Sequence, residues 1–552
     1  MTRKLLTLLV STSGLILVGA AIFAREIGID HNVEWGAKRI VLSIVGLGIF
    51  LAGIFIERIL SWTERYLIPS RIHAHPLYVR LIRLIKEYSI IIPPIAIVLI
   101  VYIWFAGAGS WTAWPERTDY YILLARAFQK QELDLPVEPS EKLLALADPY
   151  DPSQRIGVGE PLDFSLYQGK FYLYWGPVPA LLLVPLHPDI LRNISDIHLV
   201  FGFSCALFLL LTYLIVVLRE RHFSFLPKWT LVMSILLAGL SGPTVWMLGE
   251  GEIYEAAILG SQFFMIAGFA AAFLLNDSSP DKTRLLLSGA LWALAIGTRL
   301  TLVVPIGVMM AMLVWRVWRH HSHRLADIIQ RLLFLGLPML IGFGLLAWYN
   351  RARFGSISET GFTYQLAGTH IQRHLHEVIS YRYVIQNIYN YLLAPIQFSS
   401  TFPFLVTNPG SIQPVLPFYE LPGFYNAFFI TGLIYSFPFV FFTFFLLKNP
   451  GTTSIPGRIE DQKNADLTWS IRTLFASTLS ALLFLLVFFW AAMRYIADFF
   501  PTLLLISLIG YFRGYIWAKE KGRERDMAIL GISVAAVSVF ISTALAISEY
   551  IL

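Results

Sequence analysis

A single acidic residue stands just before a pair of tyrosines, early in the longest polar interval of the first half of the chain. Asp119 is followed directly by Tyr120 and Tyr121, and it comes shortly after an apolar stretch. A carboxylate can serve as a general base that takes the proton from an attacking hydroxyl group. Aspartate also caps helices, because its oxygens accept hydrogen bonds from free backbone N–H groups. The position therefore predicts either a catalytic base or a helix cap.

Three arginines lie at or near the ends of apolar segments far apart in the sequence: Arg299, Arg353 and Arg494. A guanidinium group offers a planar fork of donors that suits two-point contact with phosphate. An arginine at a membrane boundary can instead extend toward lipid headgroups while its stem stays in apolar surroundings. We predict that these arginines bind phosphate, with Arg494 the strongest candidate because Tyr495 and Pro501 follow it.

Asp148 and Asp151 each precede a proline, an arrangement that favours turns. Oxygen ligands of this kind also suit a divalent cation, although their spacing matches no established metal loop. The sequence thus indicates no cofactor with certainty and leaves a divalent cation at Asp148 and Asp151 as a weak candidate.

The composition indicates the kind of protein that must position these residues. Of 552 residues, 56% are hydrophobic and 14% are charged, whereas soluble domains carry roughly 25% charged residues. Apolar segments long enough to cross a bilayer recur along the chain. They predict an all-α polytopic membrane protein with about thirteen transmembrane helices, at Leu5–Ala24, Ile40–Leu60, Ile90–Gly107, Ile197–Leu218, Trp229–Leu248, Ile253–Leu275, Leu285–Gly297, Leu300–Trp315, Leu332–Tyr349, Ala427–Leu447, Ile471–Trp490, Ile496–Phe512 and Ile529–Tyr550.

The distribution of charge predicts the orientation of these helices. Basic residues gather at 58–88 and 513–526, on the side that the positive-inside rule makes cytoplasmic. The N-terminus is then cytoplasmic, and two large outer loops cover about 108–196 and 350–425. The first holds twelve Asp or Glu against seven Lys or Arg. The net charge of +6 is explained by topology, so we expect no nucleic-acid partner.

Three parts of the chain follow from this topology. Residues 1–88 form an extra N-terminal transmembrane pair with a basic cytoplasmic loop, 89–515 form the core with both outer loops, and 516–552 form a cytoplasmic basic turn and the last helix. Met1–Ala24 has the alternative of being a signal peptide. The single cysteine, Cys205, excludes an intrachain disulfide.

The first outer loop is predicted to hold elements that lie along the membrane surface. Ile122–Gln131 has the spacing of a short amphipathic helix, which would place Asp119 near the interface. The aromatic and proline-rich Phe171–Pro179 leads into an apolar stretch. That pattern predicts a broken, half-inserted helix, because irregular backbone at membrane depth must be buried or line a cavity.

In their order along the chain, these segments resemble the GT-C glycosyltransferase superfamily. The similarity is greatest to bacterial relatives of the protein O-mannosyltransferases and of the lipid A aminoarabinose transferases. Matching positions are Asp119 with its tyrosines, Tyr174-Trp175-Gly176-Pro177 with Leu181, and Met493–Pro501; Gly289–Thr301 is similar to the family's short outer hairpin. The chain departs from the family where Tyr120 stands in place of Glu and Trp175-Gly176 in place of His or Lys.

The resemblance implies a function and a set of roles. It implies a hexosyl- or pentosyltransferase that moves a sugar from a polyprenyl-phosphate donor to an acceptor on the extracytoplasmic face of the plasma membrane. Asp119 would be the base, and the three arginines would bind the donor phosphate. The substrate pocket would include Tyr120, Asp163, Lys170, Tyr174, Trp175 and Tyr495.

The partners implied are the lipid-linked sugar and membrane lipids, with an acceptor that is a lipid, a glycan or a protein. Two alternatives remain open. One is a lipid or sugar transporter or flippase, for which charged residues at mid-membrane and broken helices in two matching halves would be expected. The other is a catalytically silent membrane protein of the same fold, because fold alone does not determine function.

Overall fold

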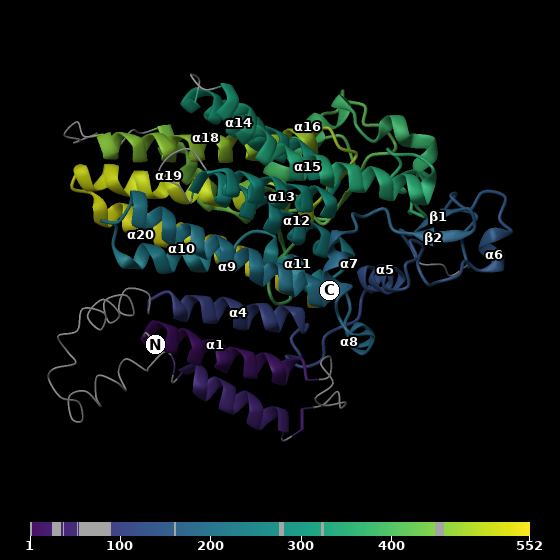
Figure 1. Cartoon of the computed structure of the whole chain (residues 1–552), viewed down its shortest axis with the longest axis horizontal. Helices are drawn as coiled ribbons and strands as arrows, with labels where there is room; N and C mark the ends of the chain where they lie inside the picture. The colour runs from purple at the N-terminus through teal and green to yellow at the C-terminus, as the bar shows by residue number, and fades with distance from the viewer. Residues whose placement is uncertain are drawn as a thin grey trace. The chain divides into compact units, whose positions relative to one another are not determined.

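The computed structural model describes residues 3–24, 35–36, 38–51, 53, 90–158, 162–274, 281–321, 325–447 and 458–551. This part of the chain is mainly helical (Figure 1). Eight of its helices have the length and composition to cross a membrane: Asp196–His222, Lys228–Glu250, Ile253–Phe273, Leu300–Arg319, Leu325–Phe354, Ala465–Leu486, Phe500–Glu520 and Glu524–Glu549. The prediction of a helical, multi-pass membrane protein is therefore confirmed for the described residues, while the count of about thirteen stays a prediction.

Contacts divide the chain into two compact units, of which the smaller takes in residues 1–115, 186–194 and 228–236. It contains α1 (Arg3–Ile22), a helix over residues 38–51, α4 (Ile92–Ala106) and α8 (Pro188–Asn193). Two glycines let the first two helices approach closely. A Cβ atom on Gly14 would lie 2.4 Å from the backbone nitrogen of Phe50, and one on Gly46 would lie 2.8 Å from that of Val18. Small residues are typical of such membrane helix contacts.

The larger unit takes in residues 116–185, 195–227 and 237–552. Its long helices pack side by side, α12 against α9 and α13, α13 against α15, α14 against α18, and α19 against α18 and α20 (Figure 1). Their bounds are α9 Asp196–His222, α12 Ile253–Phe269 with η1 Ala270–Leu274, α13 Lys282–Thr298, α14 Val303–His321, α15 Leu325–Phe354, α18 Arg458–Leu486, α19 Phe500–Glu520 and α20 Glu524–Ile551.

One of the eight spans is broken in the middle. It consists of α10 (Lys228–Leu240) and α11 (Thr244–Glu250), separated by Ser241, Gly242 and Pro243. Gly242 has a φ of +74°, and a Cβ atom there would lie 2.2 Å from the ring of Phe500. A proline that follows cannot donate the backbone hydrogen bond that would continue the helix. Gly242 and Pro243 therefore together cause the break between α10 and α11.

The first long loop (108–196) folds into short elements. They are α5 (Tyr120–Gln129), α6 (Glu141–Leu144), the antiparallel hairpin β1 (Ser165–Tyr167) and β2 (Lys170–Tyr172), and α7 (Val178–Leu183). Figure 1 shows the hairpin and α6 beyond one end of the helical bundle. The predicted amphipathic helix is confirmed as α5, which packs against α7 and α9. The predicted broken helix over Phe171–Pro179 is wrong, because its first residues pair in the hairpin and only α7 is helical.

The second long loop (350–425) contains 3₁₀ turns, one short helix and short strands. These are η3 (Phe362–Tyr364), η4 (Ile371–Glu377), η5 (Tyr381–Tyr383), α16 (Val384–Ile388), the π turn η6 (Tyr389–Leu393), and the antiparallel pair β3 (Gln397–Phe398) and β4 (Leu405–Val406). Beyond it, β5 (Asn426–Phe428) pairs in parallel with β6 (Trp490–Ala492).

That strand pair corrects two predicted spans. Ala427–Leu447 is not one helix, because it begins in β5 and continues through α17 (Leu433–Ser436) and the 3₁₀ segment η7 (Pro438–Leu447). The span predicted from Ile496 begins instead at Phe500, after β6 and the 3₁₀ turn η8 (Met493–Asp498). An apolar run inside a protein satisfies its backbone by strand pairing as well as by a helix. The basic loop predicted at 58–88 lies outside the described residues, and the three-part division of the chain stays a prediction.

Candidate functional site

One cavity of about 1030 Å³ collects residues from most of the larger unit. Its walls come from the β2–α7 connection, the start of α12, the turn between α13 and α14, the end of α15, the second long loop and η8. Seven of the residues predicted to act together line it: Asp163, Tyr174, Trp175, Arg299, Arg353, Arg494 and Tyr495. The structure thus brings together residues that the sequence separates by more than three hundred positions.

Arg494 is held by a buried acid and an aromatic ring. One of its terminal nitrogens, Nη1, lies 3.6 Å from Oε1 of Glu255, whose side chain is fully buried. The guanidinium carbon lies 4.1 Å from the centre of the Tyr254 ring, a cation–π arrangement. Within the described part of the chain, Nε of Arg494 and Oε1 of Glu255 are buried without a hydrogen-bond partner. Nε of Arg494 and Oε1 of Glu255 can therefore still form hydrogen bonds with a ligand.

Arg299 also lies near the ring of Tyr495. Its guanidinium carbon is 5.1 Å from the centre of that ring, and the corresponding distance for Arg494 is 5.8 Å. Arg299 donates through Nη2 to Oδ2 of Asp498 at 3.0 Å and through Nε to Thr301 at 2.9 Å. The second Asp498 oxygen, Oδ1, is buried without a partner among the described residues. Two guanidinium groups thus lie close to one aromatic ring, and each is paired with a buried carboxylate.

The strand pair β5–β6 explains why Arg494 and Tyr495 lie here. Trp490, Ala491 and Ala492 pair with residues 426–428, and Met493 N–H donates to the carbonyl of Phe429 at 3.0 Å. The chain then continues through η8, and α19 begins at Phe500 with Pro501 in its first turn. A continuous helix would have spread these side chains around its circumference. The short 3₁₀ turn fixed by the strand presents both to the cavity.

Arg353 also lines the cavity, but its N–H groups are already occupied. It donates to the carbonyl of Leu173, through Nη2 to Oδ1 of Asn350 at 3.0 Å, and weakly to two further carbonyls. Its guanidinium carbon lies 3.7 Å from the centre of the Tyr349 ring. Arg353 therefore ties the end of α15 to the segment after β2, and its predicted contact with a donor phosphate stays a prediction.

Asp163 is one of two acidic residues that line the cavity, and the other is Glu359. Its carboxylate accepts hydrogen bonds from the hydroxyl of Tyr254 and from the side-chain amide of Gln365. Its φ of +68° is uncommon for a residue other than glycine, and such strain is concentrated at functional sites. Burial raises the pKa of Asp163, while Gln365 and the nearby Arg494 act in the opposite direction. Tyr254 therefore contacts Asp163 through its hydroxyl and Arg494 through its ring.

The aromatic segment after β2 forms one wall. The rings of Tyr174 and Trp175 stack with centres 3.9 Å apart, and Trp175 meets the edge of Tyr254 at 5.3 Å. A Cβ atom on Gly176 would lie only 2.1 Å from the carbonyl oxygen of Gly297. The backbone of this segment thus lies directly against the end of α13. A side chain at position 176 would therefore separate the two segments.

Asp119 does not line the cavity, and neither does Tyr120. Asp119 occupies the N-cap position of α5, but its side chain makes no capping hydrogen bond, so the alternative of a helix cap is wrong. The atoms packed around it partly bury its carboxyl, which raises its pKa, while Arg126 lowers it. The Tyr120 hydroxyl donates to the carbonyl of Leu162 at 3.1 Å, and Leu162 lines the cavity. Tyr120 therefore connects Asp119 to the cavity wall.

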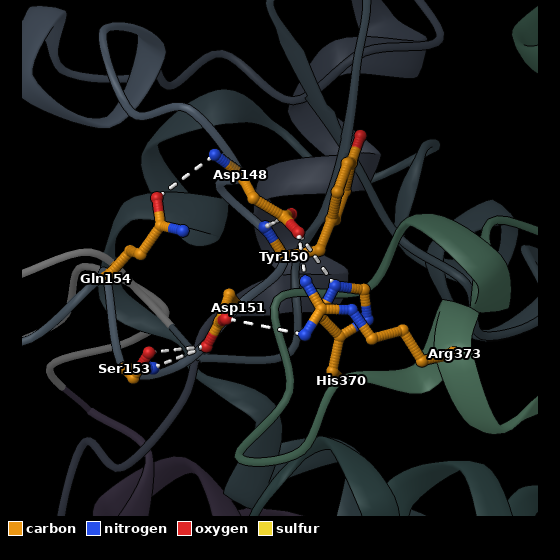
Figure 2. A network of polar contacts seen from close by, with 7 residues as sticks. All are labelled: Asp148, Tyr150, Asp151, Ser153, Gln154, His370 and Arg373. Atoms are coloured by element: carbon orange, nitrogen blue, oxygen red, sulfur yellow. Dashed lines mark hydrogen bonds and ion pairs between the residues drawn. The ribbon is translucent and has the colours of Figure 1, made fainter.

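Lys170, Asp148 and Asp151 lie away from the cavity. Lys170 has an exposed side chain at the start of β2 and pairs with Asp134 at 2.9 Å. Figure 2 shows Asp148 beside His370 and Arg373 of the second long loop, both at 3.0 Å, and Asp151 at 3.6 Å from Arg373. A hydrogen bond from His370 is the largest influence that lowers the pKa of Asp148.

The environment of these two aspartates does not fit the predicted cation. Arg373 already supplies positive charge to both carboxylates. Among the described residues, no three His, Cys, Asp or Glu side chains converge as a metal ion would require. The two aspartates instead join the first long loop to the second, and a divalent cation elsewhere stays a prediction.

No family profile and no curated protein matches this sequence. Among solved structures, the chain is similar to the oligosaccharyltransferase of Archaeoglobus fulgidus in its apo form, with a TM-score of 0.41 and 12% sequence identity. The match covers 84% of this chain and 56% of the archaeal one, so the chain spans little more than half of that protein's length. A TM-score this low does not establish a shared fold. The cavity and its residues therefore carry the functional argument.

Sequence reasoning missed four residues that complete the site: Asp196, Tyr254, Glu255 and Gln365. A weak signal existed for the first three, because polar or ionisable residues in the first turn of a membrane span are costly unless they have a partner. Asp196 begins α9, and Tyr254 and Glu255 follow directly after the start of α12. Gln365 lies in an irregular loop, where the sequence offers no periodicity from which to place it.

Proposed function

We propose that this protein is a membrane glycosyltransferase that moves a sugar from a polyprenyl-phosphate donor to an acceptor hydroxyl or amide group. The observation that carries the proposal is the mixed polar and apolar lining of the cavity. Arg299, Arg494, Tyr495 and Asp163 contribute charged and polar groups to this lining. Apolar surface comes from Phe343, Leu346, Phe484 and Leu485 of membrane-spanning helices and from Ile296 of α13. Such a lining suits a molecule with an anionic, sugar-bearing head and a lipid tail.

Arg494 and Arg299 are assigned to the donor phosphate. During transfer, the bond between the anomeric carbon and the phosphate oxygen breaks, and negative charge accumulates on the departing polyprenyl phosphate. Cationic donors already aimed at that position stabilise the charge as it develops. The unpartnered Nε of Arg494 supports this assignment, since buried polar groups without partners are uncommon except where a ligand completes them.

Asp119 is assigned as the general base, following the resemblance. It takes the proton from the acceptor as the acceptor oxygen or nitrogen forms its new bond to the anomeric carbon, with inversion at that carbon. The raised pKa of Asp119 suits a base that must bind a proton. Asp163, which lines the cavity, is assigned to sugar hydroxyl groups together with Tyr174 and Trp175. The reaction face is proposed to be extracytoplasmic, and the membrane to be the plasma membrane.

The test is native mass spectrometry of the protein, purified in mild detergent from its own membranes, to detect a co-purifying polyprenyl-phosphate sugar. The variant is Arg494→Ala, and the matched control is Lys170→Ala, which removes an exposed cation outside the cavity. We expect the lipid-linked sugar in the wild type and in the control, and its loss in Arg494→Ala. Phospholipid or free sugar alone in all three samples would contradict the proposal and favour a transporter.

A second experiment separates the two aspartates once a donor is identified. Asp119→Asn should retain the bound donor but lose transfer by a factor of about 10²–10⁴, as expected for removal of a general base. Asp163→Asn should weaken donor binding instead. If Asp119→Asn transfers the sugar at the wild-type rate, the base is not Asp119, and the Asp163 variant then shows whether the cavity acid takes that role.

A further inference from the structure

The segment that follows α16 is almost without charge. Between Tyr383 and Leu447 the sole charged residue is Glu420. In a loop facing water, such a composition is unusual, because charged side chains normally make up a large part of a solvated surface. The segment instead has the composition of chain that contacts an apolar environment.

The β3–β4 hairpin places phenylalanines on the outside of this segment. Phe398 is 83% exposed, Phe402 59% and Phe404 56%. The first lies in strand β3, and the other two lie in the connection to β4, with ring centres 6.1 Å apart. An exposed group of large apolar side chains marks an interaction surface.

The tip of the hairpin satisfies much of its own backbone. Ser399 N–H donates to the carbonyl of Phe404 at 3.0 Å, and Phe404 N–H donates to that of Thr401 at 2.8 Å. Thr401 N–H donates to the hydroxyl of Ser399 at 3.1 Å. Unsatisfied backbone groups are what exclude irregular chain from contact with lipid. The internal hydrogen bonds lower that cost for this tip.

Contacts with a membrane-spanning helix place the β3–β4 hairpin beside one end of that helix. Strand β4 packs against α20, and the hydroxyl of Thr407 donates to Oε1 of Glu549 at 2.8 Å. Glu549 is the last residue of the span Glu524–Glu549. The same helix exposes Val537 and Phe540 to its surroundings, at 47% and 61%. The exposed phenylalanines therefore lie beside the end of a lipid-facing helix.

We propose that the β3–β4 hairpin inserts its phenylalanines into the headgroup region of the bilayer at the Glu549 end of α20. Aromatic side chains favour that region of a membrane. The hairpin thus anchors the second long loop, which also lines the cavity, to the lipid surface from which an amphiphilic ligand would enter. The anchoring itself does not depend on the proposed transferase activity.

The single cysteine of the chain makes a direct test possible. In a Cys205→Ser background, a nitroxide label is placed at Phe402→Cys, and the protein is reconstituted in phosphatidylcholine nanodiscs. Two labelled controls are Phe540→Cys, on the exposed face of α20, and Lys142→Cys, an exposed residue of α6. Power saturation then compares collision of each label with oxygen, which concentrates in lipid, and with a water-soluble nickel chelate. Thermal unfolding of each variant beside the parent identifies any that does not fold.

We expect the oxygen-to-nickel accessibility ratio at position 402 to exceed that at position 142 several-fold and to stay below that at position 540, which lies deeper in the span Glu524–Glu549. A ratio equal to that at position 142 would overturn the proposal, because the tip would then lie in water. Low accessibility to both reagents would also overturn it, since the tip would then be covered by protein. Dipolar broadening between labels would identify a second copy of the chain as that cover. Phe398→Cys provides a second label position if Phe402→Cys does not fold.

Discussion

Asp196, and not Asp119, caps helix α5. Its carboxylate accepts hydrogen bonds from the backbone N–H groups of Tyr120 at 2.9 Å and Tyr121 at 3.2 Å, and from the hydroxyl of Thr118 at 2.7 Å. Asp196 starts α9, at the far end of the first long loop. Thr118 in turn accepts from the backbone N–H of Ile253, at the start of α12. Three helix starts are thus joined at one point, and the Asp119 carboxylate is left out of the cap.

This arrangement predicts that substitution of Asp196 destabilises the protein more than substitution of Asp119 does. Asp196→Ala removes the cap and leaves buried donors without a partner, so we expect it to lower the free energy of unfolding by about 1–3 kcal/mol. Asp119→Ala removes no hydrogen bond of the cap, and its effect should stay within about 0.5 kcal/mol. Thermal unfolding in detergent measures both. Equal destabilisation by the two variants would show that Asp119 contributes to the cap after all.

The pKa of Asp119 predicts how activity depends on pH. Partial burial raises it above the ordinary value of 3.8, so the folded protein holds this proton more tightly than the unfolded chain does. The carboxyl therefore favours the folded state when protonated, and that contribution decreases as the pH rises above 3.8. As a base, Asp119 must be deprotonated, so kcat/KM should rise with pH through an inflection above 3.8. The pH profile of sugar transfer measures this inflection.

The Glu variant serves as the control for that profile. Asp119→Glu keeps a titratable carboxyl and should retain a shifted acidic inflection, whereas Asp119→Asn should remove it. An unchanged profile in Asp119→Asn would assign the titration to another group, with Asp163 the first candidate because it lines the cavity and its pKa is also raised by burial.

The sequence alone was sufficient to predict the long membrane-spanning helices. The spans now seen as α9, α12 with η1, and α20 were predicted to within about five residues at each end, because a bilayer requires continuous apolar helices. Helix α15 extends further than the predicted Leu332–Tyr349 at both ends. The residues of the cavity were predicted in part, since Asp163, Trp175, Arg299 and Arg494 belong to motifs in loops and at helix ends. Their convergence could not be derived, because it depends on non-local packing such as the approach of Gly176 to Gly297.

The strand pair β5–β6 shows where the sequence reasoning failed. Residues 427–447 are as apolar as a span, and hydropathy alone does not distinguish a buried strand from a helix. The parallel pairing of Ala427 with Ala491 joins segments more than sixty positions apart. Neither segment contains a local signal for its partner, so residues 427–447 were predicted as one helix, and Trp490 and Ile496 were predicted as the end and the start of two others.

The ion pairs of Arg373 with Asp148 and Asp151 join the two long loops, and we expect them to contribute little to stability and to act only locally. Arg373→Ala removes the cation shared by Asp148 and Asp151 (Figure 2). Because Arg373 is exposed, we expect a loss of no more than about 1 kcal/mol, seen as faster hydrogen exchange in residues 148–155. The matched control is Arg192→Ala, which breaks an exposed pair with Asp189 on α8 and should leave that segment unchanged. Unaltered exchange in Arg373→Ala would mean that the loops are joined by other contacts.

The contribution of Asp148 to the contact between the two long loops should not change with pH near neutrality. Its pKa is lowered, chiefly by the hydrogen bond from His370. A lowered carboxyl pKa stabilises the folded state above the ordinary value of 3.8, and the contribution is lost as the pH falls through the lower value of the folded protein. The contribution of Asp148 to protection of residues 148–155 should therefore persist at pH 5 and fade in strong acid.

The pair of Arg494 and Glu255 allows a structural role to be separated from a binding role. Arg494→Ala leaves the fully buried Glu255 as an uncompensated charge, so we expect a loss of about 3–5 kcal/mol in unfolding free energy. Glu255→Gln added to Arg494→Ala removes that charge and should restore most of the lost stability. Donor binding should nevertheless stay absent, because the guanidinium group proposed to bind the donor phosphate is still missing. Unfolding and native mass spectrometry of both variants measure the two effects. If the double variant regains the lipid-linked sugar together with its stability, Arg494 serves only to neutralise Glu255, and Arg299 becomes the remaining candidate for the donor phosphate.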